Sequence, residues 1–210
     1  MEGATGLARA ILRSTSLGDT PLSIDAVATQ PLALDAHILR LAREDEGAAL
    51  ETLYRTYKDR IYTFLLRLTA GAELADDLTQ DTFMRAGKAL PSLDLDRRLL
   101  PWLYRIASNA AIDEIRRRRR FSWLRWRSLH GTQDEPHAPD EHARVPERER
   151  IGKLLATIPT ENVAALLLHA VEGYSYKEIA EIQGASLTAV RSRIARARAA
   201  FRDGYQPATD

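Results

Sequence analysis

Apolar residues recur at three- and four-residue intervals through most of this chain, and this period restricts its fold more than any other feature. In residues 47–69 the apolar positions share one side of a helix: Leu50, Leu53, Tyr57, Ile61, Phe64 and Leu68. The alternation with period two that is typical of strands is weak throughout. The sequence therefore predicts an all-α protein. Further helices are expected at 73–89, 99–119, 148–157, 160–172, 175–183 and 187–203.

One segment interrupts the helical pattern in the middle of the chain. Residues 128–147 combine prolines and a glycine with acids and histidines and carry almost no apolar side chains, which is typical of a flexible linker. A chain of 210 residues is long enough for one small helical domain on each side of it. We expect an N-terminal extension at 1–33, flexible apart from a short helix at 5–13, a first domain at 34–127, the linker at 128–147, a second domain at 148–206 and a tail at 207–210.

Charge is segregated along the chain, although the formal net charge is only +1. Residues 73–81 carry acids and no base, and residues 134–147 are acidic again. Residues 97–127, by contrast, are rich in arginine, and residues 187–202 carry arginines and no acid. Such a partition indicates an anionic partner and a separate basic one.

Composition disfavours several classes of site. The chain has no cysteine, so disulfides, thiolate nucleophiles and cysteine ligands to zinc are excluded. It has no glycine-rich phosphate loop. The linker histidines His130, His137 and His142 could chelate a metal, but ordinary solvated side chains are the favoured interpretation. We therefore expect no enzyme, no cofactor, no metal and no small-molecule substrate.

The hydropathy pattern does not predict insertion into a membrane. The longest apolar run, residues 163–171, is far shorter than the roughly 20 residues that cross a bilayer. Arg9 and Arg13 interrupt the region in which a signal peptide would be continuously apolar. We expect a soluble cytoplasmic protein.

The segment GYSYKEIAEIQGASLTAVRSRIARARAAFR, residues 173–202, predicts a helix-turn-helix. Ser175 can cap a helix together with Glu178, as in a capping box, and Gly184 stands where a left-handed residue would end that helix. Ser186 can cap the next helix after a three-residue turn. Turns of this length place a recognition helix in the major groove of DNA.

The second helix of this motif has two different sides. One side is apolar and should face a core: Val190, Ile194, Ala197 and Phe201. The opposite side carries small residues flanked by arginines: Ser192, Ala195 and Ala199, with Arg191, Arg193, Arg196, Arg198 and Arg202 beside them. Small side chains let a backbone approach base edges, while guanidinium groups reach phosphates or guanine. Binding to duplex DNA is favoured over a merely solvated basic helix.

Three motifs in order resemble one family: DDLTQDTFMRAGKAL (76–90), WLYRIASNAAIDEIRRRRR (102–120) and EGYSYKEIAEIQGASLTAVRSRIARARAAF (172–201). They are similar to bacterial group 4, or extracytoplasmic function (ECF), sigma factors of the sigma-70 family. The likeness spans about residues 35–205, and residues 1–33 fall outside it. It implies a region 2 module that docks on the beta-prime clamp helices of core RNA polymerase and opens the −10 element. It also implies a region 4 module that reads the −35 element of promoter DNA and touches the beta flap.

The resemblance also implies which residues bind. The polymerase-docking helix of the family matches Asp76, Asp77, Gln80 and Asp81. From the residues alone, Asp77 and Asp81 form an i, i+4 pair suited to cationic side chains, although a solvated acidic face has the same pattern. Loop 91–98 matches the segment that captures a flipped base, and Asn109 matches an asparagine beside that pocket.

Capture of a single strand needs a hydrogen-bonding edge, an apolar wall and cations for the backbone. For −10 DNA we expect Ser92, Leu93, Arg97, Arg98, Arg105, Asn109, Arg116 and Arg117. Trp102 is expected in the core rather than as a stacking platform. For −35 DNA we expect Ser186, Thr188, Arg191, Ser192, Ala195, Arg196 and Arg198. The chain departs from the family pattern at Leu93 and Leu99, where an aromatic residue is common, and at Thr188 and Ala189, which replace glycine and threonine.

Five consecutive arginines, Arg116 to Arg120, end the predicted helix 99–119. In relatives this helix lies along promoter DNA, so phosphates would neighbour the charge and binding would weaken with salt. Cations at the C-terminal end of a helix also interact favourably with the helix macrodipole, which explains part of this arginine run. Three roles stay open for the nearby Trp123 and Trp126. They could pack on region 2, seat the linker in polymerase, or form part of the binding surface for an inhibitor.

The expected function is that of a non-catalytic promoter-specificity factor for RNA polymerase. The alternative is a helix-turn-helix regulator that binds duplex DNA without joining polymerase, which leaves the motifs of the first domain unexplained. Relatives are commonly held inactive by an anti-sigma factor wedged between the two modules, and such a protein is a further candidate partner.

Overall fold

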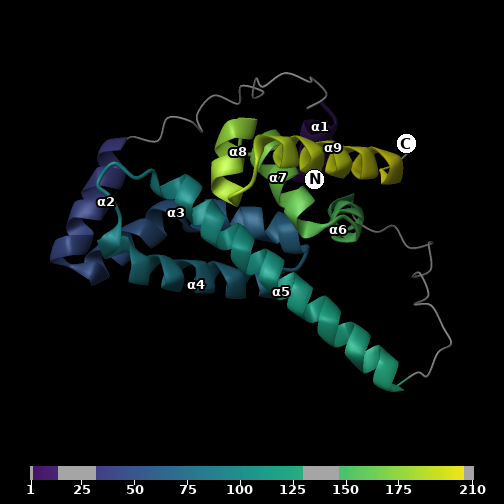
Figure 1. Ribbon diagram of the computed structural model, residues 1–210, viewed down its shortest axis with the longest axis horizontal. Coiled ribbons are helices and arrows are strands. Elements are labelled where there is room, and N and C mark those ends of the chain that lie inside the picture. The colour runs from purple at the N-terminus through teal and green to yellow at the C-terminus, as the bar shows by residue number, and fades with distance from the viewer. Residues whose placement is uncertain (1, 14–31, 130–146, 206–210) are drawn as a thin grey trace.

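The computed structural model describes residues 2–13, 32–129 and 147–205, and within these ranges it is helical and without strands (Figure 1). The helices are α1 (Glu2–Arg13), α2 (Leu32–Glu44), α3 (Glu46–Thr69), α4 (Ala72–Ala89), a 3₁₀ turn (Leu90–Ser92), α5 (Leu99–Leu129), α6 (Glu147–Thr157), α7 (Thr160–Ala170), α8 (Tyr176–Gln183) and α9 (Leu187–Gly204). The all-α prediction is confirmed. Across the described ranges, no helix combines the length and apolar character that crossing a bilayer demands.

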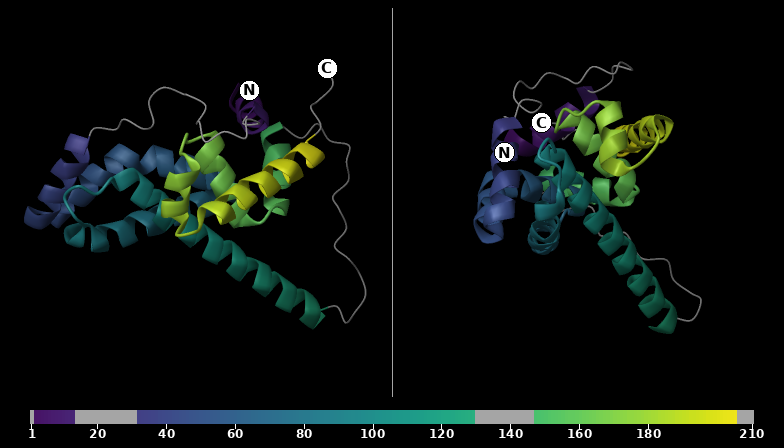
Figure 2. Two further views of the ribbon diagram at one scale, coloured as in Figure 1. Left: turned by 45° about the horizontal axis from the view of Figure 1, so that its top comes forward. Right: turned by 60° about the vertical axis from the view of Figure 1, so that its left-hand side comes forward.

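The predicted helix at 99–119 is too short, because α5 continues to Leu129 and projects away from the other helices (Figure 2). No proline or glycine occurs between Trp102 and His130, and arginine and leucine are good helix formers, so nothing local stops the helix. The side chains of Trp123 and Trp126 lie outside the described part, as does most of the predicted linker. The short helix expected at 5–13 is α1, which starts earlier.

Helices α2 to α5 form the first module. The predicted stripe of α3 faces its core: Leu53, Tyr57, Ile61, Phe64 and Leu68 are buried, and Leu50 is half-buried. α3 packs against α2, α4 and α5. Ala70 ends α3 in the left-handed region, with φ 57°, and lets the chain reverse into α4.

A buried carboxylate joins three helices of this module. Asp35 on α2 is only 5% exposed, and it accepts a hydrogen bond from the Tyr57 hydroxyl of α3. Its other oxygen accepts a hydrogen bond from the backbone N–H of Leu99 at 3.0 Å. Leu99 is the first residue of α5, and the first N–H groups of a helix have no acceptor within the helix. Burial, together with the hydrogen bond to the Asp35 carboxylate, raises the pKa of Tyr57 far above its usual value, so the phenol remains a donor.

Asp35→Ala is expected to destabilise the first module by about 2–4 kcal/mol, because it leaves two buried donors without an acceptor. The free energy of unfolding measured by urea denaturation checks this. His37→Ala, a change on the exposed side of the same helix, is the control and should alter stability little. Equal stability of the two variants would contradict the role given to Asp35.

Helices α6 to α9 form the second module around α7, whose residues are buried except for Glu161. This module packs on the first: α6 and α7 contact α3, while α7 and α8 contact α5 (Figures 1 and 2). Helix α1, although it precedes the first module in sequence, packs against α6, α7 and α9 with Ala8 and Ile11 buried. Neither of these contacts was predicted from the sequence.

Candidate polymerase- and DNA-binding surfaces

The helix-turn-helix has the local geometry that the sequence predicts. The Ser175 hydroxyl accepts the Glu178 N–H at 3.3 Å, and the Glu178 carboxylate accepts the Ser175 N–H at 2.9 Å, which completes the capping box. Gly184 ends α8 with φ 59°, a left-handed conformation that favours glycine. The Ser186 hydroxyl then caps α9 by accepting the Ala189 N–H at 3.1 Å.

The two sides of α9 separate as expected. Val190, Ile194, Ala197 and Phe201 are all buried. Of the residues predicted to contact −35 DNA, five are exposed and two are half-buried: Ser186, Thr188, Arg191, Ala195 and Arg196, and then Ser192 and Arg198. α9 therefore presents small and cationic side chains on one accessible side, as a major-groove helix requires.

One arginine of α9 braces the motif internally. Arg193 donates to the Gln183 side-chain oxygen at 2.8 Å, and the Gln183 amide donates to the Glu161 carbonyl at 3.1 Å. This chain of hydrogen bonds joins α9, α8 and α7 and sets the angle at which α9 is presented. From the sequence, Arg193 was expected only among the flanking arginines; this contact was not predicted, because its partner lies ten residues away across the turn.

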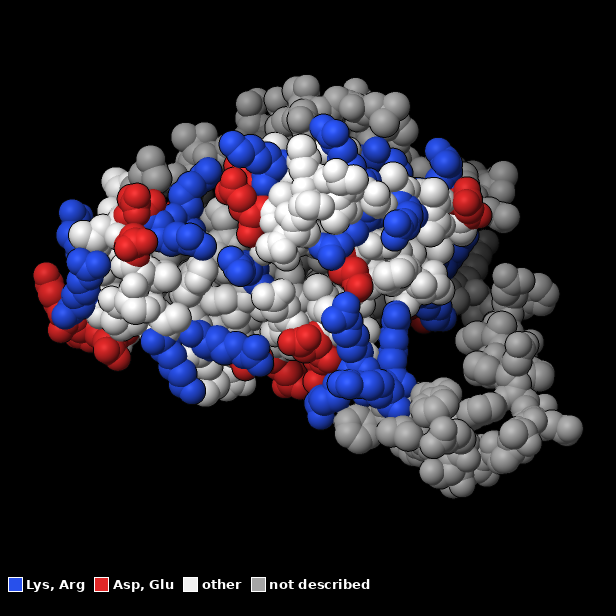
Figure 3. All heavy atoms as spheres, in the orientation of Figure 1, with Lys and Arg blue, Asp and Glu red and all other residues white. Residues whose placement is uncertain are grey.

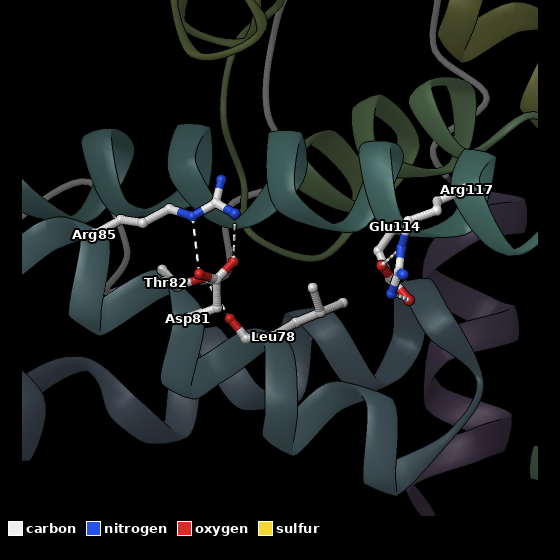
Figure 4. A network of polar contacts seen from close by, with 6 residues as sticks. All are labelled: Leu78, Asp81, Thr82, Arg85, Glu114 and Arg117. Carbon is white, nitrogen blue, oxygen red and sulfur yellow. Dashed lines mark hydrogen bonds and ion pairs between the residues drawn. The ribbon is translucent and has the colours of Figure 1, made fainter.

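The acidic side chains of α4 form one surface of the first module. Asp76, Asp77 and Gln80 are exposed, and Asp81 is half-buried. Asp81 is bound by Arg85, with the Nε atom 2.9 Å and Nη2 2.7 Å from its oxygens (Figure 4). Its charge is therefore partly neutralised within α4, whereas Asp76, Asp77 and Glu73 in the first turn of the helix are exposed carboxylates.

An exposed methionine extends this surface. Met84 lies one helical turn beyond Gln80 on α4 and is 56% exposed. Methionine beside a charged rim is typical of protein interfaces. Met84 was not identified from the sequence, although its spacing of four residues from Gln80 was the signal that could have identified it.

A groove between α4 and α5 separates these acids from the arginine run. It is lined by Asp77, Leu78 and Asp81 of α4 and by Glu114 and several arginines of α5, including Arg116 and Arg117 (Figure 4). Glu114 accepts hydrogen bonds from the Nε atoms of Arg117 and Arg118, each at 2.7 Å, and these hydrogen bonds lower the pKa of Glu114 to about 2. Arg117 and Arg118 are thus oriented by Glu114 while they remain exposed.

Basic side chains gather where α5 leaves the body of the molecule (Figure 3). Arg116 to Arg120 are all exposed there. Arg116 donates to the Glu161 carboxylate at 3.0 Å, and Arg119 to the Ala156 carbonyl at 2.9 Å, so two of the five contact the second module.

The loop between α4 and α5 is held at its start. The Ser92 hydroxyl, at the end of the 3₁₀ turn, donates to the carbonyl of Ala89 at the end of α4 at 2.8 Å. Leu93 is half-buried against the core, and its carbonyl accepts a hydrogen bond from Arg43 of α2 at 3.3 Å. Arg43 was not identified from the sequence, because its partner is 50 residues away.

The end of this loop forms a pocket of mixed charge with the start of α5. Arg97, Arg98 and Arg105 line it together with Trp102 and with two acids of the loop, Asp94 and Asp96. The wall opposite belongs to α8, with Glu178, Glu181 and Ile182. Trp102 is 9% exposed and belongs to the core, as predicted. Asn109 is exposed one turn beyond Arg105 on α5.

The structure thus brings three of the predicted −10 contacts, Arg97, Arg98 and Arg105, to one pocket. Ser92 and Leu93 lie at the other end of the loop, and Arg116 and Arg117 line the separate groove against α4. Among the described residues no cluster of three acids or histidines could hold a metal ion, and His130, His137 and His142 lie outside the described part.

Comparisons with known proteins match both modules. The model of Sigma-70 region 2 matches residues 53–121, and that of Sigma-70 region 4 matches residues 148–201. Among solved structures, RpoE in complex with the anti-sigma factor NepR from Bartonella quintana has a TM-score of 0.57 over 74% of this chain and 96% of that one; at 22% identity it shows the fold alone. CnrH in complex with the cytosolic domain of CnrY is 27% identical, with a TM-score of 0.52 over 81% of this chain and 96% of that one.

Curated relatives are similar over most of the chain. ECF RNA polymerase sigma factor SigE of Mycolicibacterium smegmatis is 35% identical over 73% of this chain and 60% of its own length. RNA polymerase sigma factor YlaC of Bacillus subtilis is 34% identical over 71% of this chain and 88% of its own. ECF RNA polymerase sigma factor SigC of Mycobacterium tuberculosis is 33% identical over 87% of this chain and 96% of its own. The chain therefore belongs to the ECF RNA polymerase sigma factors of the sigma-70 family.

Proposed function

We propose that this protein acts in the cytoplasm, where it docks on core RNA polymerase through α4, reads a −35 element through α9 and captures the melted −10 strand at the start of α5. The observation that carries the proposal is that region 2 and region 4 both match, in that order, in one chain. The sigma factors are not a class of enzyme. Accordingly, the mechanism proposed here uses binding energy alone.

Promoter opening in this mechanism is a shift of an equilibrium between duplex and melted DNA. A surface that binds the single strand and not the duplex stabilises the melted state by its difference in affinity, without hydrolysis of a nucleotide. Arg97, Arg98 and Arg105 supply cations for the backbone, and the exposed amide of Asn109 supplies a hydrogen-bonding edge for a base. Leu93, half-buried at the loop's start, offers a smaller apolar wall than an aromatic residue would.

An anti-sigma factor is the further partner that we propose. RpoE and CnrH, the two solved relatives described above, are each held in a complex, one with the anti-sigma factor NepR and the other with the cytosolic domain of CnrY. Co-purification of a small helical protein with this chain from its native cells would support that partner. The regulator that binds DNA without polymerase is not favoured by the comparisons, and a pull-down with core polymerase separates the two functions.

Asn109→Ala is expected to lower formation of the open complex about tenfold, the effect of losing one hydrogen bond of about 1.4 kcal/mol. Transcripts that appear when the protein is overexpressed identify a promoter, and permanganate reactivity of its −10 thymines then measures melting. Binding to duplex −35 DNA should be unchanged, because Asn109 lies on α5 and not on α9. Wild-type melting by the variant would remove Asn109 from base capture.

A further inference from the structure

The loop before α5, which the proposed function uses for base capture, is held at both ends by one helix. At its start the Leu93 carbonyl accepts a hydrogen bond from the Arg43 guanidinium at 3.3 Å. At its end the Leu99 N–H donates to the Asp35 carboxylate at 3.0 Å. Asp35 and Arg43 both belong to α2, which also packs on the 3₁₀ turn from which the loop leaves (Figures 1 and 2). Both contacts are made to backbone atoms, so they constrain the path of the chain whatever side chains the loop carries.

The contact with Asp35 replaces a helix cap that the loop does not supply. The first N–H groups of a helix have no acceptor within the helix, and a side chain just before the helix commonly accepts one of them. Here Arg98 precedes α5, and a guanidinium group has no acceptor. Asp35, 64 residues from Leu99 in the chain, accepts this N–H instead and places a negative charge at the positive end of the helix.

The two anchors are unequal in strength. Asp35 is 5% exposed and Leu99 is fully buried, so water does not readily replace the acceptor of the Leu99 N–H when Asp35 is removed. Arg43, by contrast, is exposed, and its hydrogen bond competes with water. We therefore expect Asp35 to contribute most of the constraint on the loop and Arg43 a smaller part.

Between the two anchors the chain is accessible to a ligand. Residues 94–97 are all exposed, and Leu95 is an apolar side chain among three charged ones. The Arg97 N–H donates to the Asp94 carbonyl at 3.0 Å and closes a turn between the anchors. A short segment fixed at both ends has fewer conformations to lose on binding. Anchoring therefore favours binding without adding a contact to the ligand.

Anchoring also sets the position of the first turns of α5. Arg105 and Asn109, which the proposed function places at the melted strand, are exposed on these turns. The side chains of a binding site must be held to within about 0.5 Å of their productive geometry to be effective. Because the start of α5 is tied to α2, the loop and these two side chains keep one fixed relation.

We propose that α2 positions the −10 capture loop, with Asp35 as the main positioning residue and Arg43 as the second. The effect on DNA capture rests on the proposed function, whereas the anchoring of the loop does not. The Sigma-70 region 2 match begins at residue 53, so α2 lies before the matched segment. No binding role was expected for either residue from the sequence.

Amide hydrogen exchange of the free protein, followed by NMR, tests the anchoring. Asp35→Ala and Tyr57→Phe both remove the hydrogen bond between these two side chains, but only Asp35→Ala removes the acceptor of Leu99. Relative to buried amides of α3, which report global stability, the Leu99 N–H should exchange at least about tenfold faster in Asp35→Ala than in the wild type. In Tyr57→Phe it should stay within about twofold of the wild type. Equal relative exchange in Asp35→Ala and the wild type would overturn the anchoring.

Binding of a promoter fork tests the consequence for DNA. The holoenzyme is assembled from core polymerase and an excess of each variant, and a fluorescent fork of the mapped promoter presents a single-stranded −10 segment. Asp35→Ala should bind the fork about tenfold more weakly than the wild type, while its affinity for the −35 duplex stays within about twofold. Tyr57→Phe should stay within about threefold on the fork. Equal losses in the two variants would mean that stability governs capture, and would overturn the positioning role.

A second pair of variants keeps the test decisive if Asp35→Ala does not fold. Asp35→Asn retains a carbonyl for the Leu99 N–H and offers an amide donor to the Tyr57 oxygen, so it should recover most of the fork affinity. Asp35→Leu/Tyr57→Phe replaces both polar partners by apolar groups, which limits the loss of stability, but it leaves Leu99 without its acceptor. Equal fork affinities of these two proteins would overturn the role of Asp35.

Arg43 has a matched control on its own helix. Arg43→Ala should weaken fork binding about threefold, whereas Arg40→Ala, the same change at another exposed position of α2, should leave it unchanged. Equal affinities of these two variants would overturn the role of Arg43. Failure of the wild-type protein to direct transcription would instead overturn the proposed function, and the hydrogen-exchange result on anchoring would be unaffected.

Discussion

The variant Asp76→Arg/Asp77→Arg is expected to bind core RNA polymerase at least about 100-fold more weakly than the wild type, which corresponds to about 2.7 kcal/mol. These two carboxylates are exposed on α4, whereas Asp81 is already paired with Arg85. Reversal replaces attraction to a basic partner helix with repulsion. Because both side chains are exposed, the fold itself should be little affected. Affinity for labelled core polymerase, measured by fluorescence anisotropy at fixed salt, checks the prediction.

The control for this variant is Glu44→Arg/Asp59→Arg. It changes the net charge by the same amount at two other exposed positions of the first module. Its affinity for core polymerase should remain within about threefold of the wild-type value, because exposed charges distant from an interface act only through screened long-range fields. Equal losses in the two variants would mean that net charge, and not the surface of α4, governs association.

Ala195→Glu is expected to remove specific recognition of the −35 element, with a loss of at least about 100-fold in duplex affinity at physiological salt. Ala195 is exposed in the middle of the accessible side of α9, where a small residue allows close approach to base edges. A carboxylate there both blocks the approach and faces phosphates. Anisotropy with a labelled −35 duplex measures the loss.

Ala200→Glu provides a matched control for that change. It adds the same side chain to another exposed position of the same helix, one that lies off the small-residue side. Specific binding by Ala200→Glu should therefore persist, with a modest decrease from its added negative charge. Wild-type specificity in Ala195→Glu would show that another part of the protein reads the duplex.

Local patterns in the sequence were sufficient for most helices and for the helix-turn-helix. The period of α3 identified the residues that are buried, and Ser175, Glu178, Gly184 and Ser186 are caps whose partners lie within four residues in the chain. Such contacts depend on backbone geometry that the sequence specifies locally. The binding roles assigned to the exposed residues of α4, α5 and α9 stay predictions, since exposure permits contact with a partner without demonstrating it.

Contacts between distant parts of the chain could not be derived in this way. Glu172 lies in a segment that reads as a polar turn, yet its hydrogen-bonding partner Tyr104 is 68 residues away. Asp35 likewise resembles an ordinary acid in the first turn of a helix, although it joins α2 to α3 and α5. The sequence pattern of α1 suggested a short helix. It did not indicate that α1 packs against the second module, because an apolar stripe does not specify which surface it contacts.

The proposed function requires that this chain join core RNA polymerase and determine where transcription begins. The most direct measurement is in vitro transcription of the native genomic DNA by purified core polymerase, with and without the protein, followed by mapping of transcript 5′ ends. We expect a new and limited set of start sites that share upstream sequence at the −35 and −10 spacing and that disappear with Asp76→Arg/Asp77→Arg. Identical start sites with and without the protein would contradict it.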